Sequence, residues 1–121
     1  MSVILIVEDD AFIRQIGEVM IQDCGHQTLS AGSVCEALAI LRSSQPLDAL
    51  FTDIYLESAM HGGCDLAIQA RSLRPGLPVI YTSGNTLTEK MKSLFLGDAW
   101  FLPKPYTQTQ LKNSVEGLLA A

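Results

Sequence analysis

The chain has 121 residues, of which 48% are hydrophobic and only 17% charged, so it can form one hydrophobic core and is too apolar to remain disordered. A net charge of −5 without a basic cluster argues against direct nucleic-acid binding through a basic stripe. No apolar run approaches the ~20 residues that span a bilayer, and no signal peptide is visible. We therefore expect a single domain over residues 1–121 that is cytoplasmic and does not contact a membrane.

Five short apolar runs alternate along the chain with longer amphipathic stretches, which is the pattern of strands separated by helices. The first, third and fourth runs are almost entirely apolar, as expected for strands that are buried on both faces of a parallel sheet. The predicted strands cover residues 3–7, 26–30, 48–52, 78–82 and 98–102.

The stretches between these runs carry apolar residues at helical spacing. Capping boxes begin two of the predicted helices, one with Ser33 and Glu36 and the other with Thr107 and Gln110. The predicted helices are marked by Ile13, Ile16, Met20 and Cys24, by Val34, Ala37, Leu38 and Leu41, by residues 64–73, by residues 86–95, and by Leu111, Val115, Leu118 and Leu119.

The elements form five strand-then-helix units, (βα)5. Five units are too few for a closed eight-stranded barrel. We therefore expect an α/β fold of the flavodoxin-like, doubly wound type, with a five-stranded parallel sheet in the order 2-1-3-4-5.

Charged or hydroxylated residues stand at the ends of four runs. The carboxyl ends of parallel strands meet at one edge of the sheet, where open α/β sheets bind their ligands. We therefore expect these groups to converge on one phosphate and cation site. They are Glu8, Asp9 and Asp10 after the first run, Asp53 after the third, Ser83 after the fourth and Lys104 after the fifth.

Glu8, Asp9 and Asp53 are predicted to form a divalent-cation site. Two carboxylates ~4 Å apart repel by roughly 4 kcal/mol at an effective dielectric of ~20, so the cluster must take up a proton or bind a cation. Mg²⁺ prefers oxygen ligands and keeps several waters beside one or two carboxylates. Mg²⁺ is the expected cofactor, with Mn²⁺ able to substitute; the alternative is that these acidic residues only cap the following helices.

Asp53 is the candidate nucleophile, because a carboxylate can attack phosphorus and form an acyl phosphate. The charge of the transferred group must be neutralised, largely by cation and ammonium groups. We expect Lys104 to contact one phosphoryl oxygen and the Ser83 hydroxyl to donate to another. A cis bond before Pro105 would aim Lys104 inward; an ordinary trans proline is the alternative.

Four motifs in order give the chain a resemblance to a known family: ILIVEDD at residues 4–10, TDI at 52–54, LPVIYTSG at 77–84 and FLPKPY at 101–106. The chain resembles a response-regulator receiver domain, the phospho-acceptor part of two-component signalling, over essentially its whole length. The resemblance implies a signalling switch that catalyses only its own phosphorylation and dephosphorylation, and is otherwise not an enzyme.

The resemblance also implies roles for the acidic residues. Asp53 would be the phospho-acceptor and Asp9 the direct Mg²⁺ ligand. Glu8 would act on the metal through a water, and Tyr55 through its backbone carbonyl. Asp10 lies outside the family's acidic pair and is expected to begin a helix.

The same resemblance identifies the residues that read the phosphoryl group. Ser83, which precedes the small Gly84, would be the switch hydroxyl in place of Thr82. Phe101, three positions before Lys104, matches the aromatic residue that swings inward when the hydroxyl is drawn to the phosphate; the alternative is an ordinary half-buried strand aromatic.

A two-state switch is the implied mechanism. A partner histidine kinase or histidine phosphotransfer protein would donate the phosphoryl group from its own phosphohistidine. Phosphorylation of Asp53 would then change the face formed by the fourth predicted helix, strand 98–102 and the last helix, which would bind a downstream protein target. The last helix lacks the arginine-rich pattern of receivers that dimerise on DNA, so we expect a monomer or weak dimer.

The chain departs from the family pattern after Asp53. Glu57 stands where the family usually has a proline, and the stretch that closes with residues 61–63 is one residue longer than usual. Tyr55 and Asn85 flank the site at positions where the family varies, and we expect them to tune the access of water to the acyl phosphate.

Two alternatives are open at this point. The chain could be the receiver fragment of a hybrid histidine kinase or of a larger regulator. It could also be a Mg²⁺-dependent aspartyl-phosphate phosphatase acting on small substrates. Such phosphatases usually place a second acid two residues after the nucleophile, where this chain has Tyr55.

Overall fold

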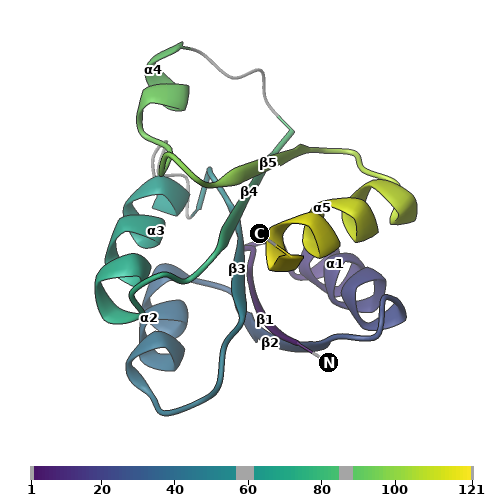
Figure 1. Ribbon diagram of the computed structural model, residues 1–121, viewed down its shortest axis with the longest axis horizontal. Helices are drawn as coiled ribbons and strands as arrows, with labels where there is room; N and C mark the ends of the chain where they lie inside the picture. Colours follow the sequence, from purple (N-terminus) through teal and green to yellow (C-terminus); the bar gives the residue numbers. More distant parts are fainter. Residues whose placement is uncertain (1, 57–61, 85–88, 121) are drawn as a thin grey trace.

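The computed structural model describes residues 2–56, 62–84 and 89–120, in which five strands alternate with five helices (Figure 1). The strands are β1 (Val3–Val7), β2 (Gln27–Ala31), β3 (Ala49–Asp53), β4 (Val79–Ser83) and β5 (Trp100–Pro103). The helices are α1 (Ala11–Asp23), α2 (Val34–Arg42), α3 (Gly62–Leu73), α4 (Glu89–Ser93) and α5 (Gln108–Ala120).

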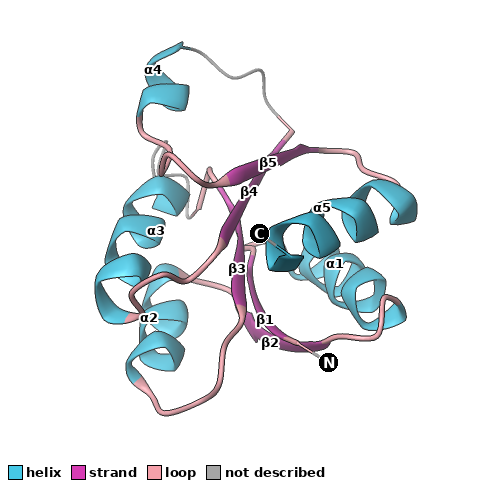
Figure 2. Cartoon of the chain, in the orientation of Figure 1, coloured by secondary structure: helices cyan, strands magenta, loops and turns pink. Residues whose placement is uncertain are grey.

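The five strands form one parallel sheet in the order β2-β1-β3-β4-β5, which confirms the predicted topology. Figure 2 shows α2 and α3 against one face of the sheet, and α1 and α5 against the other. The strand order reverses between β1 and β3, and in such sheets the ligand site lies outside the carboxyl ends of the strands at that point.

The core lies on both faces of the sheet. Every residue of β3 and β4 is buried, as the continuous apolar runs predicted. Leu5 and Leu50 belong to the apolar cluster on the α2–α3 side, whereas Ile6 and Phe51 belong to the cluster on the α1–α5 side. The edge strands β2 and β5 are only partly buried, which explains the weaker apolar pattern of β2.

Four strands differ at their ends from the prediction. β2, β3 and β4 begin and end one residue later than expected, and β5 covers Trp100–Pro103 in place of residues 98–102. The reason is that backbone pairing with the neighbouring strand continues one residue further, with Ala31 paired to Val7, Asp53 paired to Thr82 and Ser83 paired to Pro103. Asp53 and Ser83 are therefore the last residues of their strands.

Two helices also differ from the prediction. α3 begins at Gly62 instead of residue 64, and the Gly63 N–H donates a hydrogen bond to the carbonyl of Ile54 at 2.8 Å. α4 ends at Ser93, two residues before the predicted end, and the chain then turns with the Phe95 N–H bonded to the Lys92 carbonyl. The predicted start of this helix at residue 86 lies outside the described residues.

Both predicted capping boxes are present. The Ser33 hydroxyl accepts a hydrogen bond from the Glu36 N–H at 3.1 Å, and the Glu36 carboxylate accepts one from the Gly32 N–H at 2.9 Å. In the second box, the Thr107 N–H donates a hydrogen bond to Oε1 of Gln110 at 2.9 Å, and the Gln110 N–H donates one to Oγ1 of Thr107 at 3.1 Å. Each cap is worth about 1 kcal/mol of helix stability.

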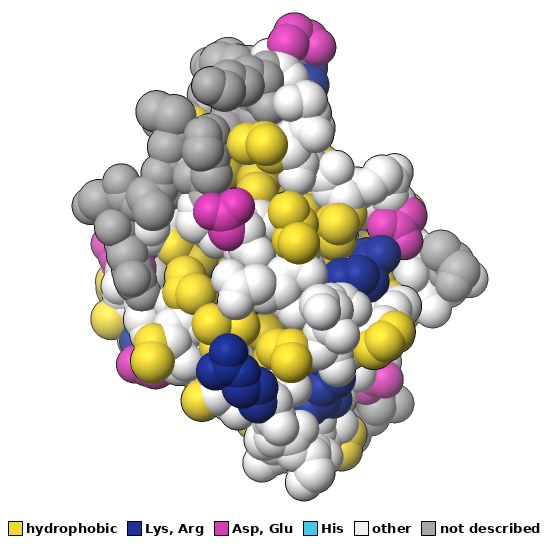
Figure 3. All heavy atoms as spheres, turned by 90° about the vertical axis from the view of Figure 1, so that its left-hand side faces the viewer, with side chains coloured by type: hydrophobic (Ala, Val, Ile, Leu, Met, Phe, Trp, Pro, Cys, Tyr) yellow, Lys and Arg dark blue, Asp and Glu magenta, His cyan; other side chains and the backbone are white. Residues whose placement is uncertain are grey.

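The surface of the α2–α3 side is chemically mixed. Figure 3 shows hydrophobic, basic and acidic side chains interspersed on this side, and the described side chains visible there form no continuous basic area.

None of the helices in the described part of the chain has the length and apolar character needed to cross a membrane.

Trp100, the only tryptophan, lies against Gly117 of α5: a Cβ atom on Gly117 would lie 2.9 Å from Cζ3 of the indole and closer still to Cη2. Gly117→Ala is therefore expected to push the indole, already 39% exposed, further into water and to shift its fluorescence emission to longer wavelength. The free energy of unfolding should change by less than about 1 kcal/mol, because the better helix propensity of alanine offsets the lost ring contact. Lys112→Ala, at an exposed position of α5, should leave the spectrum unchanged. An unshifted spectrum for Gly117→Ala would contradict this packing.

Candidate functional site

The carboxyl ends of the central strands bring the predicted polar residues to one edge of the sheet. The register pairs Asp53 at the end of β3 with Thr82 of β4, and Ser83 at the end of β4 with Pro103 of β5. Lys104 follows β5 directly. Residues far apart in the sequence therefore meet because parallel pairing aligns the strand ends.

Lys104 joins two buried carboxylates at this edge. Its Nζ lies 2.7 Å from Oδ2 of Asp53 and 2.5 Å from Oε1 of Glu8. Asp53 is 7% exposed and Glu8 is 5% exposed. Burial acts to lower the pKa of Lys104, but hydrogen bonds to Asp53 and Glu8 outweigh it and hold that pKa above its ordinary value. The ammonium group therefore stays charged between the two carboxylates.

The backbone around Lys104 is fixed to β4. The Lys104 N–H donates to the carbonyl of Ser83 at 2.9 Å. The peptide bond between Lys104 and Pro105 is cis.

The acceptor candidate Asp53 is held from two sides. Its Oδ1 accepts a hydrogen bond from the Tyr55 N–H at 2.9 Å, while Oδ2 contacts Lys104. Gly63 of α3 packs directly on the Asp53 backbone, because a Cβ there would lie 2.8 Å from the Asp53 carbonyl carbon and closer still to the oxygen. Sequence reasoning treated Gly63 only as the end of a loop and missed this contact; the glycine pair at residues 62–63 was the available signal.

Glu8 sits deeper than the two acidic residues that follow it. Its Oε2 accepts from the Asp10 N–H at 3.3 Å, and its backbone carbonyl accepts from Nη1 of Arg14 at 2.8 Å. Burial raises the pKa of Glu8 to about 7; the hydrogen bond from Lys104 opposes this rise, and the charge of Asp53 adds to it. The Arg14 contact was not predicted.

Asp10 caps α1, as expected for a residue outside the acidic pair. Its Oδ1 accepts hydrogen bonds from the Phe12 and Ile13 N–H groups at 2.9 and 3.0 Å. Asp9, between Glu8 and Asp10 in the sequence, is exposed.

The donor atoms at this edge suit a hard divalent cation. Glu8 and Asp53 offer carboxylate oxygens, and the single ammonium group of Lys104 contacts both. Two carboxylates and one ammonium leave an excess of negative charge, to which Asp9 adds. Within the described ranges, no three His, Cys, Asp or Glu side chains lie close enough together to hold a metal by themselves. Mg²⁺ does not need such a cluster, because it keeps several waters and binds through one or two carboxylates. The donor set therefore fits Mg²⁺.

Two hydroxyl groups lie at the end of β4. Ser83 is 1% exposed and Thr82 is 2% exposed. Their side chains point to opposite faces of the sheet, since successive strand residues alternate. Oγ1 of Thr82 has no hydrogen-bond partner among the described residues.

Residues 4–116 match the sequence model of the response regulator receiver domain. The chain belongs to the response regulator receiver domain family. Among solved structures, this receiver domain is similar to a response regulator receiver protein from Sinorhizobium medicae WSM419, with a TM-score of 0.89 and 30% identity over 99% of this chain and 95% of that one. It is also similar to NtrX from Brucella abortus, with a TM-score of 0.86 and 30% identity over 98% of this chain and 27% of that one.

Curated relatives of the receiver domain are longer proteins. Response regulator MprA of Mycobacterium bovis (strain BCG / Pasteur 1173P2) is 31% identical over 117 residues, which cover 96% of this chain and 50% of MprA. A putative NtrX-like response regulator of Rickettsia bellii (strain RML369-C) is 28% identical over 89% of this chain and 23% of its own length. The chain thus spans half or less of these relatives, which are response regulators of two-component signalling.

Phe101 of the receiver domain belongs to a row of three aromatic rings. Phe95, after α4, stacks on Tyr81 of β4 with ring centroids 4.4 Å apart and on Phe101 with centroids 6.0 Å apart. The Tyr81 hydroxyl accepts from the Leu96 N–H at 3.2 Å. Phe101 is half-buried, and the row connects β5 with the segment that follows α4.

The remaining predicted positions are placed only in part. Gly84 is exposed after β4, and Tyr55 is half-buried after β3. Glu57, where the chain departs from the family pattern, and Asn85, which is expected to tune water access, lie outside the described residues.

Proposed function

We propose that this receiver domain accepts a phosphoryl group on Asp53 from the phosphohistidine of a histidine kinase or histidine phosphotransfer protein. The observation that supports this most strongly is the position of the Lys104 ammonium group, which contacts the carboxylates of both Asp53 and Glu8. Such a group can neutralise charge that develops on a phosphoryl oxygen beside Asp53.

The surroundings of Asp53 support its role as nucleophile. The Tyr55 N–H and Lys104 orient the carboxylate through one hydrogen bond to each oxygen. In the transfer, an oxygen of Asp53 forms a bond to phosphorus while the bond between phosphorus and the histidine nitrogen breaks, and the nitrogen keeps the electron pair.

We infer that the transfer requires Mg²⁺. Asp9 and Asp53 would hold the ion directly, with Glu8 acting through a water and Tyr55 through its backbone carbonyl. When bound, the ion supplies positive charge to the phosphoryl oxygens. Mn²⁺ can take its place, because carboxylate, carbonyl and water oxygens suit both ions.

The proposed output is binding to another protein. The Ser83 hydroxyl would donate to the phosphoryl group, and Phe101 would turn inward as this hydroxyl moves. These changes would alter the face formed by α4, β5 and α5, which would bind a downstream protein target. The domain would then be a switch that acts on no substrate but itself.

Phosphorylation by acetyl phosphate in the presence of Mg²⁺ tests this proposal. We expect the intact mass to increase by one phosphoryl group, and peptide mapping to locate that group on Asp53. Chelation of Mg²⁺ before the donor is added should prevent the increase. An unchanged mass with Mg²⁺ present, or an adduct on a different residue, would rule out the proposal. Steady turnover of small phosphoesters would instead indicate a phosphatase.

A further inference from the structure

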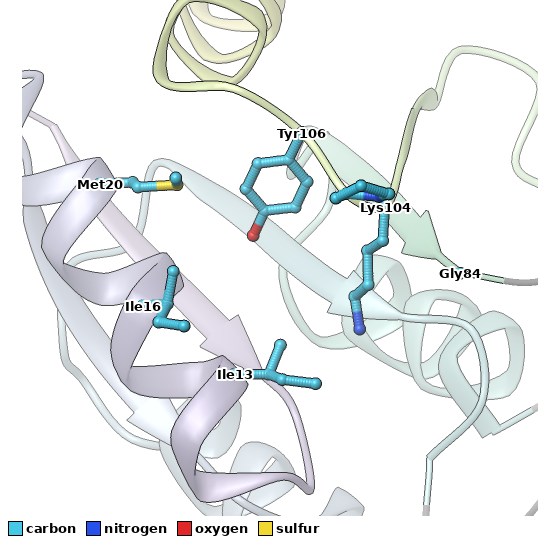
Figure 4. A pocket seen from close by; sticks show the side chains of 7 residues that line it. Ile13, Ile16, Met20, Gly84, Lys104 and Tyr106 are labelled. Atoms are coloured by element: carbon cyan, nitrogen blue, oxygen red, sulfur yellow. The ribbon is translucent and has the colours of Figure 1, made fainter.

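An open pocket of about 410 Å³ lies beside the acceptor site (Figure 4). This volume is within the roughly 300–1,000 Å³ of pockets that bind small molecules. The pocket lies between α1 and the segments that follow β4 and β5, and none of the roles described above uses its apolar part. Its lining residues are Ile13, Ile16, Met20, Gly84, Lys104, Pro105 and Tyr106.

The pocket and the acceptor site share Lys104. This residue lines the pocket, and its Nζ lies 2.7 Å from Oδ2 of Asp53. Gly84, which also lines the pocket, directly follows the end of β4. A molecule with a phosphoryl group at Asp53 can therefore extend its other end into the pocket.

The wall opposite Lys104 is apolar and open to water. Ile13 and Ile16 project from α1 towards the side on which Tyr106 and Lys104 lie, as Figure 4 shows, and they are 37% and 41% exposed. Covering these side chains with an apolar group would remove their surface from water, which is favourable.

Tyr106 adds a single polar group to this wall. Its ring packs edge-on against Phe51 with centroids 6.0 Å apart. Its hydroxyl lies close to α1, since a Cβ on Gly17 would be 3.4 Å from it. No hydrogen bond joins the hydroxyl to another described residue, and burial keeps the pKa of the phenol above its ordinary value, so it retains a proton to donate.

We propose that this pocket binds the acyl group of an apolar acyl phosphate, so that the domain takes its phosphoryl group from an aromatic or branched acyl phosphate more readily than from acetyl phosphate. This inference rests on the proposed function of Asp53. The charges fit: the phosphate end meets the Lys104 ammonium, the acyl chain meets Ile13 and Ile16, and the acyl oxygen accepts from the Tyr106 hydroxyl.

The transfer balances without a further reactant. An oxygen of the Asp53 carboxylate forms a bond to phosphorus, and the bond between phosphorus and the bridging oxygen of the donor breaks. The bridging oxygen keeps the electron pair and leaves as part of a carboxylate anion. The hydrogen bond from Tyr106 would stabilise the charge on that leaving group.

Benzoyl phosphate and acetyl phosphate are the probes. The initial rate of phosphorylation is measured by intact mass over a range of each donor with Mg²⁺ present. We expect half-maximal rate at an about tenfold lower concentration of benzoyl phosphate, because burial of part of a phenyl ring is enough for that difference. Equal half-saturating concentrations would overturn the inference while leaving the proposed function intact. Absence of phosphorylation by both donors would overturn the proposed function, and the inference with it.

Two variants separate binding in the pocket from the intrinsic reactivity of the donors. Ile16→Ser is expected to raise the half-saturating concentration of benzoyl phosphate about threefold to tenfold. Val19→Ser, at a position on α1 that is 50% exposed and outside the pocket, should leave it unchanged. Tyr106→Phe keeps the ring and should slow transfer at saturating donor about tenfold. A preference for benzoyl phosphate that is the same in Ile16→Ser would show that the acyl group does not bind here, and that the pocket serves another partner, such as a protein side chain.

Discussion

Replacement of Asp53 by asparagine is expected to lower phosphorylation by any donor at least about 10⁴-fold. The amide is uncharged and its oxygen is a poor nucleophile, so the step that forms the bond to phosphorus is lost. The shape of the side chain is retained, and the amide oxygen can still accept from the Tyr55 N–H that now binds Oδ1 at 2.9 Å. Loss of the adduct in the intact mass spectrum is the measurement.

The control is Asp65→Asn, which removes an exposed carboxylate from the first turn of α3 and should leave the rate unchanged. Folding of the Asp53 variant is checked by thermal unfolding. Lys104 keeps its contact with Glu8 in that variant, and the repulsion between Asp53 and Glu8 disappears, so a folded domain is expected. An adduct that persists at wild-type rate in Asp53→Asn would show that another residue is the acceptor.

Gly63→Ala is expected to destabilise the domain by about 3 kcal/mol or more. The added Cβ would lie 2.8 Å from both the Asp53 carbonyl carbon and the Ile54 Cα, and these are backbone atoms of the buried end of β3 that cannot rotate away. Either α3 or the end of β3 must shift, and the second movement would displace the acceptor carboxylate. Chemical denaturation gives the loss of stability, and the rate with acetyl phosphate reports the displacement.

Gly97→Ala is the matched control, because nothing lies within 4 Å of a Cβ at that position. Its free energy of unfolding should stay within about 0.5 kcal/mol of the wild-type value. If Gly63→Ala were as stable as Gly97→Ala, the close packing of α3 on β3 would be refuted.

The fold was predictable because its signals are local and agree with one another. Apolar runs such as 48–52 and 78–82 have no helical period, and the capping boxes at Ser33 and Thr107 fix two helix starts. Strand ends were misplaced by one residue because pairing depends on the neighbouring strand, which composition does not show. Asp53 therefore proved to be part of β3.

The meeting of Asp53, Glu8 and Lys104 was predictable for a different reason. Parallel strands in the expected order bring their carboxyl ends to one edge of the sheet, so the topology predicts that these residues converge there. The resemblance to receiver domains then assigned a role to each of them.

Contacts that depend on how a helix sits against the sheet could not be predicted. Gly63 against the Asp53 carbonyl, and Tyr106 against α1 at Gly17, arise from the packing distance between layers. The Arg14 hydrogen bond to the Glu8 carbonyl depends in the same way on how α1 is placed. Periodicity predicts which face of a helix is buried, but it does not give these distances.

The row formed by Tyr81, Phe95 and Phe101 makes Phe101 part of a shared apolar surface. A movement of Phe101 away from Phe95 would expose part of the Phe95 ring to water. Because exposing apolar surface is unfavourable, it would raise the free energy of the moved arrangement relative to the arrangement in the structure. A protein that covers the exposed ring would remove this cost and favour the moved arrangement. The affinity for such a partner would then depend on an aromatic contact made after α4, at a distance from the phosphoryl group itself.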